Sequence, residues 1–158
     1  MRIPDEIYEM VLRSMPIACV DLIVCNSASE ILLVRRTNEP ARGEWWFPGG
    51  RIHFGETRED AVRRQLMKEC GLQGVDVEEL WTLDVILPLD SSDRVSHGIT
   101  TIYAVTAKPP ADVALDDQAS EFEWRHVADW QEKSLHPIVR QVLLNFQERS
   151  LERSGSPR

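Results

Sequence analysis

The most constraining feature of the sequence is a helix with clearly marked ends, which follows a Pro-Gly-Gly turn at residues 48–50. Thr57 is a favourable N-cap, and Asp60 stands three residues later as in a capping box. Gly71 suits the left-handed conformation that ends many helices. We therefore expect a helix over about residues 57–70. Apolar residues at every fourth position should bury one of its faces: Val62, Leu66 and Cys70.

The remaining chain alternates apolar strands with two further helices. The helices are expected over about residues 4–13, where Pro4 suits the first turn, and over about 137–151. Strands interleaved with helices favour an α/β sandwich around a mixed sheet. One domain is expected over residues 1–152, with residues 153–158 as a disordered tail. The expected strands span residues 17–24, 31–36, 75–87, 99–107 and 122–126, with a polar hairpin around Ser91-Ser92-Asp93.

Composition and charge narrow the class of partner. The formal net charge of −8 argues against nucleic-acid binding, because a phosphate backbone requires a basic footprint. No apolar run approaches the roughly 20 residues of a membrane span, so no membrane association is expected. Three cysteines without metal-ligand spacing indicate reduced thiols and a cytoplasmic protein. A small polyanionic substrate is compatible with this charge because arginines cluster in one stretch: Arg35, Arg36, Arg42, Arg51, Arg58, Arg63 and Arg64.

Polar residues along one edge of the expected 57–70 helix point to a metal site. Gln65, Lys68 and Glu69 stand at i, i+3 and i+4, so their side chains share that edge. A carboxylate there, beside the free carbonyls of a Gly-Gly turn, could hold Mg²⁺, which prefers oxygen ligands. A surface helix with a mixed charged face is the alternative, and spacing alone favours this alternative.

Residues 49–72 resemble the Nudix box, G-x5-E-x7-R-E-U-x-E-E-x-G-U, in which U is a bulky aliphatic residue. The resemblance implies an α/β/α sandwich and hydrolysis of a nucleoside diphosphate linked to another group. Gln65 and Lys68 depart from the box, and each replaces a glutamate. Because these changes remove three units of negative charge, we expect one metal ion in place of several. The matching residues are Gly50, Glu56, Arg64, Leu66, Glu69, Gly71 and Leu72.

A longer similarity relates the chain to one Nudix branch, the GDP-mannose mannosyl hydrolases. It runs through RSMPIACVDLIV, LLVRRTNEPARGEWWFPGGR, TTIYAV and LDDQASEFEW, and so covers most of the chain. The resemblance implies one Mg²⁺ per subunit, with Mn²⁺ as an alternative, held by Gly49, Glu69 and Gln118. It also implies a homodimer and a nucleotide-sugar substrate. The residues it assigns to the diphosphate, the sugar and the nucleotide are Arg36, Arg51, Arg64, Asp21, Tyr103 and Tyr8.

The same branch implies an unusual reaction. Water attacks the anomeric carbon of GDP-mannose or GDP-glucose, and GDP leaves with its charge stabilised by Mg²⁺ and arginines. The histidine that is the base in this branch, directly after the glutamine ligand, is replaced here by Ala119. Three interpretations stay open. Glu121 or His97 acts as the base, or water attacks phosphorus as in a Nudix pyrophosphohydrolase, or the domain binds a nucleotide sugar without efficient hydrolysis.

Overall fold

The computed structural model describes residues 3–89 and 93–155. No helix in these two ranges is both long and apolar enough to cross a membrane. The helices are α1 (Asp5–Ser14), α2 (Arg58–Cys70), α3 (Val127–Gln131) and α4 (Pro137–Gly155). The strands are β1 (Ile17–Cys25), β2 (Ile31–Arg36), β3 (Trp45–Trp46), β4 (Gly49–Arg51), β5 (Gly74–Pro88), β6 (Val95–Ala107) and β7 (Ala119–Arg125).

The strands form one mixed sheet in the order β3-β2-β1-β6-β5, with β4 paired to β1 and β7 paired to β2. β1 and β6 run parallel, whereas the other pairs are antiparallel. β1 is the central strand, and it pairs with β2 near its end and with β4 through its middle residues. The β4 pairing sets Gly49 opposite Asp21 and Gly50 opposite Val20. This arrangement brings the two glycines of β4 beside Asp21, the acidic residue of β1.

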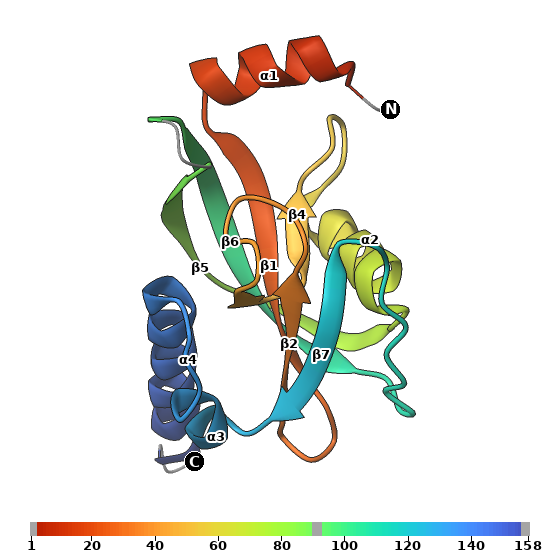
Figure 1. Ribbon diagram of the computed structural model, residues 1–158. Helices are drawn as coiled ribbons and strands as arrows, with labels where there is room; N and C mark the ends of the chain where they lie inside the picture. Colours follow the sequence, from red (N-terminus) through yellow and green to blue (C-terminus); the bar gives the residue numbers. More distant parts are fainter. Residues whose placement is uncertain (1–2, 90–92, 156–158) are drawn as a thin grey trace.

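Helices cover both faces of the sheet, so the fold is the expected α/β/α sandwich (Figure 1). α2 packs on one face, where Leu66 belongs to the same buried cluster as Leu22 of β1. α3 and α4 pack on the other face, where Trp130 and Val139 cluster with Ile23. Leu22 and Ile23 are neighbours in the chain, and strand alternation sends their side chains to opposite faces.

The ends of α2 form as the sequence predicts. Thr57 Oγ1 accepts a hydrogen bond from Asp60 N at 3.1 Å, and Gly71 ends the helix with a φ of 66°. These contacts hold the helix in one register, with its apolar stripe against the sheet and its polar edge beside β4. The stripe is at most 1% exposed: Val62, Leu66 and Cys70.

Some elements differ from the expectation. β3 and β4 form in a segment expected to be a loop, because β2 and β1 supply their hydrogen bonds, and α3 was not expected. α4 continues to Gly155, so residues 153–155 are helical where a disordered tail was expected, and 156–158 lie outside the described ranges. The expected hairpin residues Ser91-Ser92 also lie outside them, between β5 and β6.

Candidate active site

A cavity of about 800 Å³ opens between α1, β1, β4 and the polar edge of α2. Alternate residues of β1, Ile17, Cys19 and Asp21, line it from the sheet, and residues 38–41 after β2 line another side. The structure brings seven of the expected site residues to this cavity: Tyr8, Asp21, Arg36, Gly49, Arg51, Arg64 and Gln118.

Gly49 and Glu69 meet where β4 approaches α2. The Gly49 N–H donates to Glu69 Oε2 at 3.2 Å. A Cβ at Gly49 would lie 2.2 Å from Val20 O and 2.5 Å from Asp21 Oδ1, so only glycine fits here. Burial raises the pKa of Glu69 to about 7, and the charges of Asp116 and Asp21 add to the rise against the opposing backbone hydrogen bond. A cation beside Glu69 would stabilise its charged form.

Gln118 reaches the cavity from a turn built by Asp116. Asp116 Oδ1 accepts from Gln118 N at 3.0 Å, and Oδ2 accepts from Gln118 Nε2 at 3.3 Å. The Asp116 N–H also donates to Glu69 O at 3.3 Å, which joins this turn to the end of α2. Within residues 3–89 and 93–155, no cluster of three acidic, cysteine or histidine ligands forms. One carboxylate with carbonyl and amide oxygens, from Glu69, Gly49 and Gln118, is an oxygen set that fits Mg²⁺.

Asp21 is the carboxylate that lines the cavity from the sheet. Its Oδ2 accepts a hydrogen bond from Trp46 Nε1 at 3.1 Å. Burial raises the pKa of Asp21 to about 6, against the lowering effects of the Trp46 hydrogen bond and the Arg36 charge. Near neutral pH this carboxylate is therefore charged, with a proton affinity close to that of a general base.

Arg36 and Arg51 are two cations that line the cavity and are available to an anionic ligand. Arg36 Nε donates to Pro40 O at 2.8 Å, and the Arg51 guanidinium lies 5.0 Å from the centre of the Tyr8 ring. Neither arginine forms an ion pair with a carboxylate in the described part of the chain. Because a guanidinium donates paired hydrogen bonds to phosphate oxygens, these two residues could bind a diphosphate.

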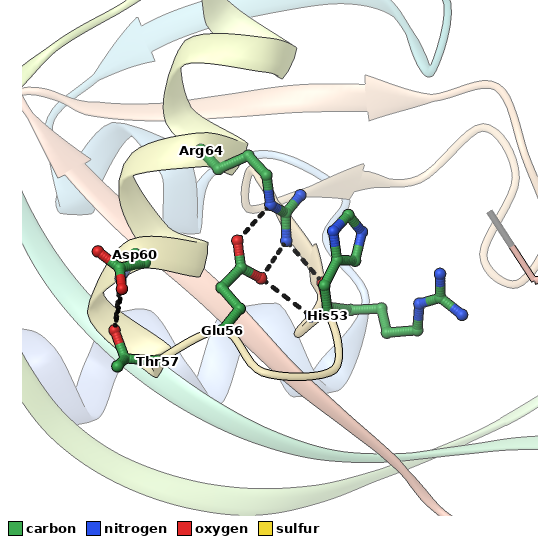
Figure 2. A network of polar contacts seen from close by, with 6 residues as sticks. His53, Glu56, Thr57, Asp60 and Arg64 are labelled. Carbon is green, nitrogen blue, oxygen red and sulfur yellow. Dashed lines mark hydrogen bonds and ion pairs between the residues drawn. The ribbon is translucent and has the colours of Figure 1, made fainter. Parts of the chain in front are cut away.

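Arg64 has a structural role, which Figure 2 shows. Its Nε and Nη2 donate to the two carboxylate oxygens of Glu56 at 2.6 and 2.8 Å, and Nη2 also donates to Arg51 O at 3.0 Å. Glu56 Oε2 in turn accepts from His53 N at 2.9 Å. The Arg64 hydrogen bonds lower the pKa of Glu56 to about 2. The Glu56–Arg64 pair therefore holds residues 51–56 against α2 and positions Arg51.

A family model matches most of the chain. The NUDIX domain model covers residues 15–146, which include the whole sheet and every element that lines the cavity except α1. This chain belongs to the Nudix family. The glycines of β4, the Glu56–Arg64 pair and Glu69 are parts of its Nudix box.

Two kinds of relative are similar to this Nudix protein. Agl8 of Haloferax volcanii, a low-salt glycan biosynthesis protein, is 32% identical over 148 residues, covering 90% of this chain and 89% of Agl8. The RNA pyrophosphohydrolase of Pseudomonas putida is 46% identical over 61 residues, covering 39% of this chain and 36% of that protein. The first similarity concerns nearly the whole domain, and the second only a part of it.

Solved structures share the Nudix fold. The NUDIX domain of Shewanella oneidensis NrtR complexed with ADP ribose gives a TM-score of 0.71 at 22% identity, covering 93% of this chain and 99% of that chain. The MutT protein from Methanosarcina mazei gives 0.69 at 22% identity, covering 87% and 97%. At this identity the likeness concerns the fold alone.

The two departures from the Nudix box both line the cavity. Gln65 is buried and Lys68 is exposed, and they lie on the α2 edge that also carries Glu69. Lys68 forms no ion pair in the described part of the chain, although its charge opposes the rise in the pKa of Glu69. Glu69 is therefore the one carboxylate on this edge, as the sequence predicts.

Neither residue expected to be the base lines the cavity. Glu121 lies on β7 and pairs with Arg35 at 3.5 Å. His97 lies on β6, 3.3 Å from Asp84 Oδ1. Its neighbour Gly98 does line the cavity, and strand alternation turns His97 to the other face. The structure does not bring either side chain to the cavity that Arg36 and Arg51 line, and the assignment of Glu121 or His97 as the base stays a prediction.

Tyr103 and Ala119 also face away from the cavity. Tyr103 lies in the core under α2, and its hydroxyl donates to Glu79 Oε2 at 2.7 Å. Ala119 packs against the same core at the start of β7. The structure therefore does not bring Tyr103 to the other residues expected to bind substrate.

Sequence reasoning did not predict the contacts of two side chains of the site, Asp116 and Trp46. Asp116 stands two residues before Gln118, a spacing that suits a side-chain hydrogen bond to the backbone N–H, so a local signal existed. Trp46 donates a hydrogen bond to Asp21, which lies 25 residues earlier in the sequence, and no local pattern indicates that contact.

Proposed function

We propose that this protein hydrolyses a GDP-sugar, with GDP-mannose and GDP-glucose as candidate substrates, to GDP and free sugar in the presence of Mg²⁺. The observation that carries the proposal is the α2 edge, where Glu69 is the one carboxylate and Lys68 and Gln65 lie beside it. Attack at phosphorus in this family relies on clustered carboxylates that gather several metal ions. One carboxylate beside a cation favours a single Mg²⁺ that stabilises a leaving group.

In this reaction the group that most needs stabilisation is the leaving group, because negative charge develops on GDP. Water's oxygen bonds to the anomeric carbon, the bond from that carbon to the diphosphate oxygen breaks, and its electron pair stays on GDP. Arg36 and Arg51 line the cavity without carboxylate partners among the described residues, so they would bind the diphosphate as its charge grows. Arg64 acts through Arg51, whose carbonyl it holds. Mg²⁺ held by Gly49, Glu69 and Gln118 would add positive charge at the diphosphate.

Asp21 takes the place of Glu121 and His97 as the base in this proposal. It lines the cavity, and its pKa of about 6 leaves it charged at neutral pH and able to accept the proton that water loses. Inverting attack at an anomeric carbon uses a carboxylate base in the same way.

A homodimer is part of the proposal. None of the residues of α1 is buried, although α1 lies across the end of the sheet and contributes Tyr8 to the cavity (Figure 1). Ile7 and Met10 are 53% and 67% exposed, and a second copy would cover them.

The similarity to a glycan biosynthesis protein supports a sugar-bearing substrate.

The test is hydrolysis of a panel of GDP-sugars with Mg²⁺ in ¹⁸O-water. We expect GDP and a free sugar that carries the label. GMP and a sugar phosphate, with the label in a phosphate, would instead show attack at phosphorus. The partial similarity to an RNA pyrophosphohydrolase makes this the second candidate. Binding without turnover would indicate a nucleotide-sugar-binding domain.

A further inference from the structure

Gln65 is a buried polar side chain that the reaction above does not use. It lies on α2, lines the cavity and is 5% exposed. Its side-chain oxygen Oε1 is buried and makes no hydrogen bond with any residue that the structure describes. Since proteins pair nearly all buried polar atoms, the unpaired oxygen of a residue that lines the cavity points to a partner outside the chain, such as a ligand that displaces the amide slightly.

Close packing against β4 holds this amide in place. A Cβ at Gly50 would lie 2.4 Å from Gln65 Nε2, so the absence of a side chain at Gly50 makes room for the amide. Gly50 also has a φ of +154°, which other residues adopt with strain. Packing against β4 therefore fixes the position of the Gln65 amide, in a residue that lines the cavity.

The charges around Gln65 decide which ligand group it can bind. Lys68 lies three residues later on the same edge, and Arg64 lines the same cavity. Glu56 offsets the charge of Arg64, so Lys68 is the cation that would repel a metal ion placed against the Gln65 oxygen. The one carboxylate of this edge, Glu69, is already assigned to Mg²⁺, whereas a neutral hydroxyl group needs no carboxylate. A hydroxyl both donates and accepts a hydrogen bond, so it satisfies the amide in either orientation.

We propose that Gln65 is a specificity residue that binds a hydroxyl group of the substrate's sugar. This inference rests on the function proposed above and adds a substrate feature to it. With the diphosphate on Arg36 and Arg51 and with Asp21 as the base at the anomeric carbon, the sugar would lie in the cavity that Asp21 and Gln65 both line. The sugar analogue that lacks the bound hydroxyl leaves the buried amide unpaired, and the protein discriminates against it for that reason.

The test compares Gln65→Leu with the wild type on one GDP-sugar and its monodeoxy analogues. The quantity measured is the kcat/KM of each analogue relative to the parent sugar, or the ratio of dissociation constants where turnover is too slow. The intrinsic reactivity of an analogue cancels between the two proteins. We expect the wild type to disfavour one analogue roughly 5- to 100-fold, and Gln65→Leu to lose that preference while keeping the other ratios.

Two further variants make the comparison decisive. Gln141→Leu, the same substitution on the exposed side of α4, should keep every wild-type ratio. Gln65→Met repeats the test if Gln65→Leu does not fold. Equal ratios in the wild type and the Gln65 variant for every analogue would overturn the proposal. A changed Mg²⁺ affinity with GDP alone would overturn it too, because the amide would then act through a metal-bound water.

Product analysis separates this inference from the proposed function. A Gln65-dependent ratio together with ¹⁸O in a phosphate would uphold the sugar contact and contradict attack at carbon. GDP-sugars that bind no more tightly than GDP would overturn the sugar contact itself. Free sugar as product with ratios independent of Gln65 would uphold the function and overturn the contact.

Discussion

Two carboxylates with raised pKa values, Glu69 and Asp21, set the pH behaviour of the candidate site. Burial raises the pKa of Glu69 to about 7 and that of Asp21 to about 6. An acid whose pKa is higher in the folded than in the unfolded state holds its proton more tightly when folded. The protein without metal therefore loses stability as the pH rises from about 4 through these values. A bound cation opposes this loss by stabilising the charged carboxylate.

Glu69→Gln should remove the loss of stability that a charged, buried Glu69 causes, and it should also remove the metal site. Without Mg²⁺ at pH 8, we expect the free energy of unfolding to rise by on the order of 1–3 kcal/mol, and the difference should vanish near pH 4. Mg²⁺ should stabilise the wild type but not the variant, and turnover should fall roughly 100-fold or more. Denaturant unfolding at both pH values and steady-state kinetics measure these effects. Near-wild-type turnover at saturating Mg²⁺ would contradict the assigned ligand.

Asp21 as the base predicts an acidic limb in the pH profile. At saturating Mg²⁺, kcat/KM should rise with pH through about 6, because only the carboxylate accepts a proton. Trp46→Phe removes a hydrogen bond that lowers this pKa, so the limb should move to higher pH, whereas Trp45→Phe should leave it in place. Asp21→Asn should slow the reaction roughly 10²- to 10⁴-fold. An unmoved limb in Trp46→Phe would mean that another group is the base.

Among the elements, α2 and the loop before it act together because the Glu56–Arg64 pair joins them. The Glu56 and Arg64 side chains are 14% and 27% exposed, whereas the Glu59 and Arg63 side chains of a second pair on α2 are 59% and 50% exposed. The Arg64 hydrogen bonds hold the pKa of Glu56 at about 2. The stability from this pair is therefore present above the unfolded pKa of about 4.3 and is lost as the pH falls toward 2.

Breaking each of these two pairs should separate their contributions. Glu56→Gln should lower the free energy of unfolding by about 1–3 kcal/mol at pH 7, because Arg64 loses a charged, partly buried partner. Glu59→Gln, the matched control on the same helix, should lower it by about 0.5 kcal/mol or less. Urea unfolding at pH 7 and pH 3 measures both, and the Glu56 effect should shrink at pH 3. Equal losses of unfolding free energy in the two variants at pH 7 would show that burial does not strengthen the Glu56–Arg64 pair.

At the scale of the whole molecule, α1 connects the cavity with the proposed dimer. Tyr8 lies against Arg51, yet no residue of α1 is buried. We expect sedimentation to find a homodimer, and the double variant Ile7→Glu with Met10→Glu to shift it toward monomer and weaken GDP-sugar binding. Val75→Glu, at a 54% exposed apolar position on β5, should stay dimeric. A monomeric wild type, or a double variant that dimerises normally, would contradict this interface.

Local sequence was sufficient where the interacting residues are neighbours along the chain. Thr57 and Gly71 predicted both ends of α2, because helix capping acts within one turn. The 31–36 strand was predicted to the residue, since an apolar run between two turn signals has few alternatives. The spacing of Gln65, Lys68 and Glu69 likewise predicted their common edge, because helical geometry alone determines it.

Contacts between distant segments depended on the tertiary structure. β4 is three residues long and forms because β1 supplies its hydrogen bonds, which no sequence periodicity could indicate. Trp46 reaches Asp21 across 25 positions only after β2, β3 and β1 have paired. His97 and Tyr103 were expected in the site but face away from it. Strand register decides which face a side chain takes, and a shift of one residue reverses it, so spacing along the chain could not place them.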